Sequence, residues 1–103
     1  MTGFGKDKKL KEVLMAIHSD ASITTTDMAL LYAMIICYTK EEHREFFQVS
    51  RSGLMEISKI SSTRTYHKCI KKLIRLGYIV YTPSYHPKFG SMVSWGKMGR
   101  FKS

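Results

Sequence analysis

STRTYHKCIKKLIRLGYI, the stretch at residues 62–79, contains the strongest structural signal in this chain. Ser62 is a preferred N-cap residue, and after it an apolar stripe recurs at helical spacing. The stripe consists of Tyr66, Cys69, Ile70, Leu73 and Ile74. Gly77 follows where a helix end needs left-handed backbone. We therefore predict an amphipathic helix over about residues 63–76, with Tyr66 in the core.

The opposite face of this predicted helix is cationic. It carries Arg64, His67, Lys68, Lys71, Lys72 and Arg75. The net charge of +9 has the same bias: residues 1–50 hold six Lys and Arg against seven acids, whereas residues 51–103 hold eleven against the single acid Glu56. Such a surface attracts polyanions, because each phosphate neutralised by Lys or Arg releases counterions from a nucleic acid. A generic solvated surface would have the same composition, so the position of the charges decides between the two interpretations.

A shorter helix and a turn are predicted before this helix. Ser50 or Ser52 can cap about two helical turns that include residues 54–58. Lys59-Ile60-Ser61 then form a three-residue turn that leads to the cap at Ser62. The two helices and their turn have the layout of a helix-turn-helix unit.

A β-hairpin is predicted after Gly77. Residues 78–82 and residues 92–95 are rich in the aromatic and β-branched side chains that strands favour. Between them, residues 83–91 contain two prolines and a glycine, which indicate a long hairpin loop.

The first half of the chain predicts three further elements. Apolar residues at helical spacing indicate an amphipathic helix over residues 8–18. A second helix, over about residues 26–39, is apolar nearly all round, which is typical of a central core helix. Residues 46–49 suit a short edge strand. The expected fold class is α+β, mainly α, with one domain over residues 1–95 and a flexible basic tail at 96–103.

The order of these elements is that of a helix-turn-helix followed by a wing. Residues 46–95 resemble the winged helix-turn-helix superfamily of DNA-binding domains. The segments that carry the resemblance are Phe47-Gln-Val-Ser, Leu54-Met-Glu-Ile-Ser, Ile60-Ser and residues 63–79, which end in the L-x-x-x-G-Y-I pattern of many bacterial members. With Leu30-Leu31-Tyr32 included, the pattern looks like the N-terminal domains of phage and plasmid replication initiators and of mobile-element regulators. Lys59 departs from this pattern, because many members have glycine in the turn.

The resemblance implies a three-helix core with an additional N-terminal helix, a short strand and a C-terminal β-hairpin wing. It places the helix at residues 63–76 in the major groove and the hairpin loop along the flanking backbone or minor groove. There Arg64 can match guanine O6 and N7, whereas Lys71 and Lys72 are better placed for phosphates. Ser62 is a candidate contact that serves equally well as a helix cap. The predicted DNA-binding residues are Arg51, Ser62, Thr63, Arg64, Thr65, His67, Lys68, Lys71, Lys72, Ser84, Tyr85, His86 and Lys88.

The prediction for function is a sequence-specific double-stranded DNA-binding protein that regulates bacterial transcription. One alternative is a replication or recombination accessory factor of a mobile element, such as an excisionase-like protein. A winged helix that binds proteins and an RNA-binding domain that stacks bases on tyrosines are two others. A homodimer through the helix at residues 8–18 would double the DNA surface, unless that helix caps the core of its own domain.

The sequence contains no pattern typical of an enzyme or a metal site. The four histidines lie about 20 residues apart, and no carboxylate pair or glycine-rich phosphate-binding motif occurs. We therefore expect no enzymatic activity, no cofactor, no metal and no small-molecule ligand. Cys37 and Cys69 have the spacing of reduced thiols in a cytoplasmic protein. The longest apolar run, residues 28–38, has 11 residues, and a membrane span needs about 20.

Overall fold

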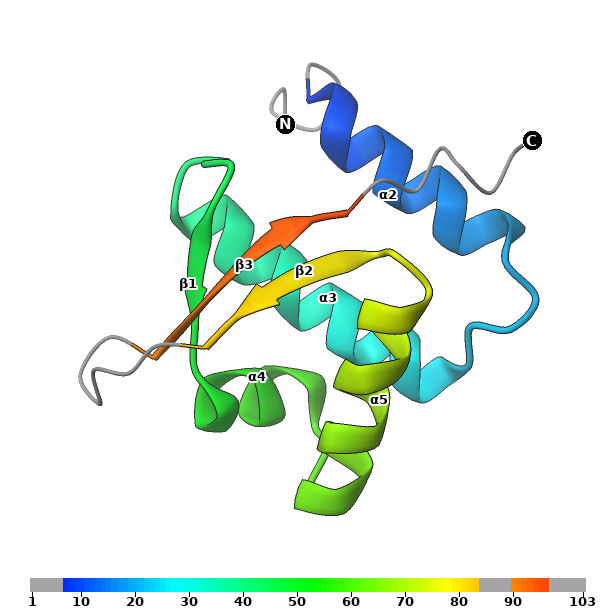
Figure 1. Ribbon diagram of the computed structural model, residues 1–103, viewed down its shortest axis with the longest axis vertical. Helices are drawn as coiled ribbons and strands as arrows, with labels where there is room; N and C mark the ends of the chain where they lie inside the picture. Colours follow the sequence, from blue (N-terminus) through cyan, green and yellow to red (C-terminus); the bar gives the residue numbers. More distant parts are fainter. Residues whose placement is uncertain (1–6, 84–89, 97–103) are drawn as a thin grey trace.

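The computed structural model describes residues 7–83 and 90–96 of the chain, and Figure 1 shows their arrangement. The helices are α2 (Lys8–Ser19), α3 (Thr25–Lys40), α4 (Arg51–Ser58) and α5 (Thr63–Arg75), and the strands are β1 (Phe47–Val49), β2 (Ile79–Thr82) and β3 (Ser91–Trp95). The strands form an antiparallel sheet in the order β1-β3-β2. The prediction of a mainly helical α+β domain is confirmed. In these segments no helix has the length and apolarity needed to cross a membrane.

Polar side chains begin each helix, as the sequence predicts for two of them. Ser50 Oγ accepts a hydrogen bond from the Gly53 N–H at 3.0 Å, so Ser50 and not Ser52 caps α4. Ser62 Oγ accepts from the Thr65 N–H at 3.2 Å and caps α5. At the start of α3, Thr24 and Asp27 form a reciprocal capping box. These local signals explain why most predicted helix ends lie within a residue or two of the observed ends.

The turn between α4 and α5 depends on a strained backbone position. Lys59 ends α4 in the left-handed conformation, with φ of 66°. Glycine adopts this conformation without steric cost, whereas a residue with a side chain loses roughly 1–2 kcal/mol. The turn then buries Ile60 in the core. Lys59 therefore takes the backbone conformation that glycine favours, and the turn keeps α4 and α5 close together.

The hydrophobic core lies between the sheet, α3 and the inner sides of the other helices. Its fully buried members include Leu30, Leu31, Leu54, Leu73 and Tyr78. Strand β3 is the centre of the sheet, pairing Val93 with Phe47 of β1 and Trp95 with Ile79 of β2. Trp95 also contacts the rings of Phe47 and Tyr38, with centroids 5.3 Å and 5.5 Å away. This aromatic cluster fills the end of the core.

Helix α2 covers one end of this core. Leu10 and Val13 on its inner face are fully buried. At its start, Asp7 Oδ2 accepts from the Tyr38 hydroxyl and lies 2.7 Å from His43 Nδ1. At its end, the Tyr78 hydroxyl lies within hydrogen-bond distance of Asp20 Oδ2 and of the Ala16 carbonyl. The apolar face of α2 is thus used within its own domain.

Helix α3 is central but is not buried on all sides. Leu30, Leu31, Ala33 and Met34 on its inner side are fully buried. On the outer side, Tyr32 is 57% exposed and Met28 is 43% exposed. The prediction of a central core helix is therefore confirmed for one side only, because no other described element covers the outer side.

Candidate nucleic-acid interface

Helix α5 has two sharply different faces. Its buried face consists of Tyr66, Cys69, Ile70 and Leu73 and anchors the helix in the core, as predicted. Its exposed face carries Thr63, Arg64, His67, Lys68, Lys71, Ile74 and Arg75. The helix contains no acidic residue. As a result, cationic side chains extend along its solvent face from the first turn to the last.

The first turn of α5 combines side-chain and backbone donors. Thr63 and Arg64 are exposed there, directly after the cap at Ser62. The first N–H groups of a helix lack partners within the helix and give this end a partial positive charge. The Ser62 hydroxyl satisfies the Thr65 N–H. The turn thus presents the Arg64 guanidinium and unpaired backbone donors in the same direction.

Arg51, on α4, belongs to the same region of the surface. It is exposed at the first position of its helix. Burial raises the pKa of the Tyr66 phenol to about 12 and the nearby Tyr81 adds to this, whereas the positive charge of Arg51 acts in the opposite direction. The influence of Arg51 on Tyr66 places a further cation beside the buried side of α5.

Lys72 has a different role from the one its sequence position predicts. Its ammonium lies 2.6 Å from Asp27 Oδ2 and 2.5 Å from the Ser22 carbonyl oxygen, and its side chain is 23% exposed. Burial raises the pKa of the Asp27 carboxyl, but hydrogen bonds from Lys72 and from the Thr24 N–H outweigh this, so that the pKa is lowered. Lys72 therefore ties α5 to the start of α3, and we do not include it among the proposed phosphate contacts.

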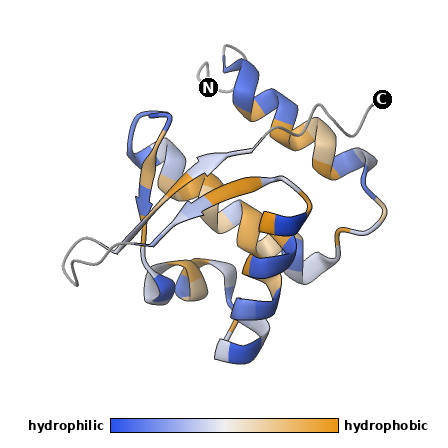
Figure 2. Cartoon of the chain, viewed as in Figure 1, coloured by the Kyte–Doolittle hydropathy of each residue, from blue (hydrophilic) through white to orange (hydrophobic). Residues whose placement is uncertain are grey.

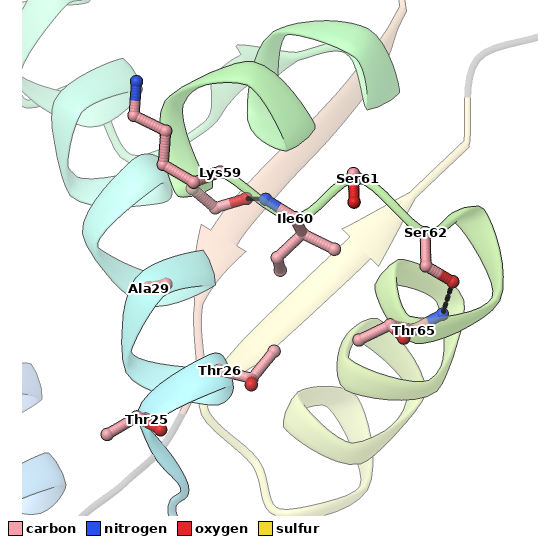
Figure 3. Close-up of a pocket in the computed structure, with 9 residues that line it drawn as sticks. Thr25, Thr26, Ala29, Lys59, Ile60, Ser61, Ser62 and Thr65 are labelled. Atoms are coloured by element: carbon pink, nitrogen blue, oxygen red, sulfur yellow. Dashed lines mark hydrogen bonds between the residues drawn. The ribbon is translucent and has the colours of Figure 1, made fainter.

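A groove that the sequence did not predict lies beside the first turn of α5. It has a volume of about 360 Å³ and separates the start of α3 from the turn between α4 and α5 (Figure 3). Its lining is rich in hydroxyl groups, and the lining residues are Thr25, Thr26, Ala29, Ser58, Lys59, Ile60, Ser61, Ser62 and Thr65. Figure 3 shows the Lys59 side chain directed away from Ser62 and Thr65. The sequence signal was the density of Ser and Thr, which we interpreted only as caps.

The predicted wing contacts cannot be placed. Ser84, Tyr85, His86 and Lys88 lie outside the described residues, as does the basic tail after Gly96. The described ends of the hairpin are nevertheless fixed by packing. Gly90 has φ of +63°, and a Cβ there would lie 2.5 Å from the Val49 carbonyl oxygen. The two strands therefore close the hairpin against β1, on the side from which α4 begins.

In the described segments, no group of three His, Cys, Asp or Glu side chains is arranged to hold a metal ion. Cys37 and Cys69 are free thiols. Comparisons with protein-family models, curated proteins and solved structures found no match. The argument about function therefore starts from the residues of α5 and their surroundings.

Proposed function

We propose that this protein binds double-stranded DNA in a sequence-specific manner, with α5 in the major groove, and that it regulates transcription. The observation that carries the proposal is the continuous cationic face of α5, which has no acidic neighbour on the helix while the opposite face is anchored in the core. The resemblance of residues 46–95 to winged helix-turn-helix domains supports the same orientation.

The dimensions of α5 suit this role. Its 13 residues extend about 20 Å at the usual helical rise, and the major groove is about 12 Å wide and admits one helix. In this orientation Arg64 and Thr63 in the first turn meet base edges. Lys68, Lys71 and Arg75 meet phosphates, which position the protein without reading sequence.

The attachment of α5 to the rest of the domain also supports the proposal. The ion pair of Lys72 with Asp27 fixes the helix near its C-terminal end. Ser62 fixes the first turn. A helix that is already ordered loses little conformational entropy on binding, so a larger part of the contact energy contributes to affinity.

The experiment that tests the proposal is selection of bound duplexes from random-sequence DNA at about 150 mM salt. We expect an enriched motif, and we expect Arg64→Ala to weaken binding to it by about 1–3 kcal/mol through loss of a base contact. Lys11→Ala is the matched control, because Lys11 is an exposed cation on α2, outside the proposed interface. An equal loss in both variants would contradict readout by α5.

The same selection separates the competing functions. Salt-sensitive binding without an enriched motif would favour an accessory factor that binds DNA architecturally, such as an excisionase-like protein. Absence of duplex binding would refute the proposal and favour a winged helix that binds proteins. Lys71→Ala sharpens the result, since loss of one phosphate contact should reduce the salt dependence by about one counterion without changing the motif.

A further inference from the structure

The outer face of α3 is apolar along most of its length. Tyr32 and Met28 are 57% and 43% exposed, Ile35 and Ile36 are half-buried, and Thr25 and Thr39 are exposed at the two ends. These residues recur at spacings of three and four, which places them on one side of the helix. Between Asp27, which is buried, and Lys40, the helix contains no charged residue.

This face is unusual for a helix at the surface of an isolated domain. A surface helix normally places charged and polar side chains opposite its buried stripe. Contiguous exposed apolar residues are a common mark of an interaction site. The buried side of α3 already supplies the core, so the apolar outer side has no use in the described fold.

The pattern of the outer face is symmetric about Tyr32. Thr25 and Thr39 lie seven residues before and after it, and Met28 and Ile36 lie four residues before and after it. In an antiparallel pair of identical helices with the two-fold axis at Tyr32, Met28 of one copy meets Ile36 of the other. Threonine meets threonine at both ends. An interface between identical copies requires this kind of self-complementarity.

The charge distribution permits two copies to approach through this face. The excess positive charge lies in residues 51–103, whereas residues 1–50, which include α2 and α3, are nearly balanced. Helix α5 packs on the inner side of α3, where Lys72 meets Asp27. Antiparallel α3 helices also bring opposite ends of their dipoles together.

From these observations we infer that α3 is a docking surface for a second copy of this chain, paired antiparallel about Tyr32. The seam involves one helix from each copy, which is small beside the roughly 1,600 Å² of a standard interface. We therefore expect a reversible dimer with a dissociation constant in the micromolar range. The pairing leaves α2 outside the interface and both α5 helices exposed.

Sedimentation equilibrium of the full chain without DNA tests this inference. Tyr32→Glu places two carboxylates at the axis, and we expect it to weaken the dimer at least about tenfold. Met15→Glu is the matched control, because Met15 is 54% exposed on α2. A wild-type chain that stays monomeric up to about 1 mM would overturn the inference. Loss of the dimer in Met15→Glu alone would overturn it too and would favour pairing through α2.

Disulfide trapping provides a second test that does not depend on the folding of Tyr32→Glu. In a Cys37→Ser background, we expect a mixture of the Met28→Cys and Ile36→Cys chains to form a cross-linked heterodimer. Each chain alone should cross-link far less, because the axis separates identical positions other than Tyr32. Preferential cross-linking within each variant would indicate parallel pairing and overturn the inference. Neither test includes DNA, so failure here is distinct from failure of DNA binding.

Discussion

Helices α3 and α5 pack against each other, and each buries one face, but their remaining faces differ. Figure 2 shows mostly apolar colours along α3, whereas α5 alternates between apolar and hydrophilic residues. The outer face of α5 is cationic and well solvated, so water satisfies it when no partner is present. The outer face of α3 gains hydrophobic stabilisation only when it is covered. Folding of one chain thus accounts for half of each helix, and the remaining halves indicate two different kinds of partner.

The comparison is broken most directly by truncating the two sides of α3. Leu31 is fully buried, so Leu31→Ala should lower the free energy of unfolding by about 3 kcal/mol through lost burial and a cavity. Met28→Ala, on the outer face, should lower it by less than about 1 kcal/mol in dilute protein. Urea denaturation of both variants measures the difference. Equal losses would mean that the outer face is buried within the monomer.

The second prediction divides the lysines of α5. Lys72→Ala leaves the buried Asp27 carboxylate without its cation, and we expect a loss of about 2–3 kcal/mol in the free energy of unfolding. Lys71→Ala, at the exposed neighbouring position, should change stability by less than about 0.5 kcal/mol. Denaturant unfolding in parallel checks both values. A stability loss in Lys71→Ala similar to that in Lys72→Ala would refute the distinction between a structural lysine and a surface lysine.

The smallest expected effect concerns the turn that leads into α5. Lys59→Gly should raise the free energy of unfolding by about 0.5 kcal/mol, because relief of the left-handed strain exceeds the entropy cost of glycine. Lys59→Ala is the control, since alanine keeps a Cβ and should give no such gain. Thermal unfolding of the two variants provides the measurement. A lower midpoint for Lys59→Gly would mean that the lysine side chain stabilises the turn.

The parts of the fold that depend on neighbouring residues could be predicted from the sequence. The cap at Ser62, the apolar stripe of α5 and the glycine after its end act within a few residues of one another. The same reasoning found the cationic face, because helical spacing alone places those side chains together.

The parts that the sequence did not reveal join distant segments. Lys72 meets Asp27 across 45 positions, so nothing near Lys72 indicates that its charge is taken up in the fold. The groove is formed by residues of α3 together with the turn before α5. Which side of α3 stays exposed depends on where the sheet and the other helices pack, and an all-round apolar pattern does not encode that choice.

The aromatic cluster at the end of the core has an optical consequence. Trp95 is the single tryptophan of the chain. It is 8% exposed, and its indole N–H has no acceptor among the described residues. Its fluorescence should therefore be emitted at short wavelength and shift to the red when the core opens to water. The cluster draws on α3 and the sheet and includes no residue of α5, so this built-in chromophore reports on the integrity of the domain during titrations with DNA.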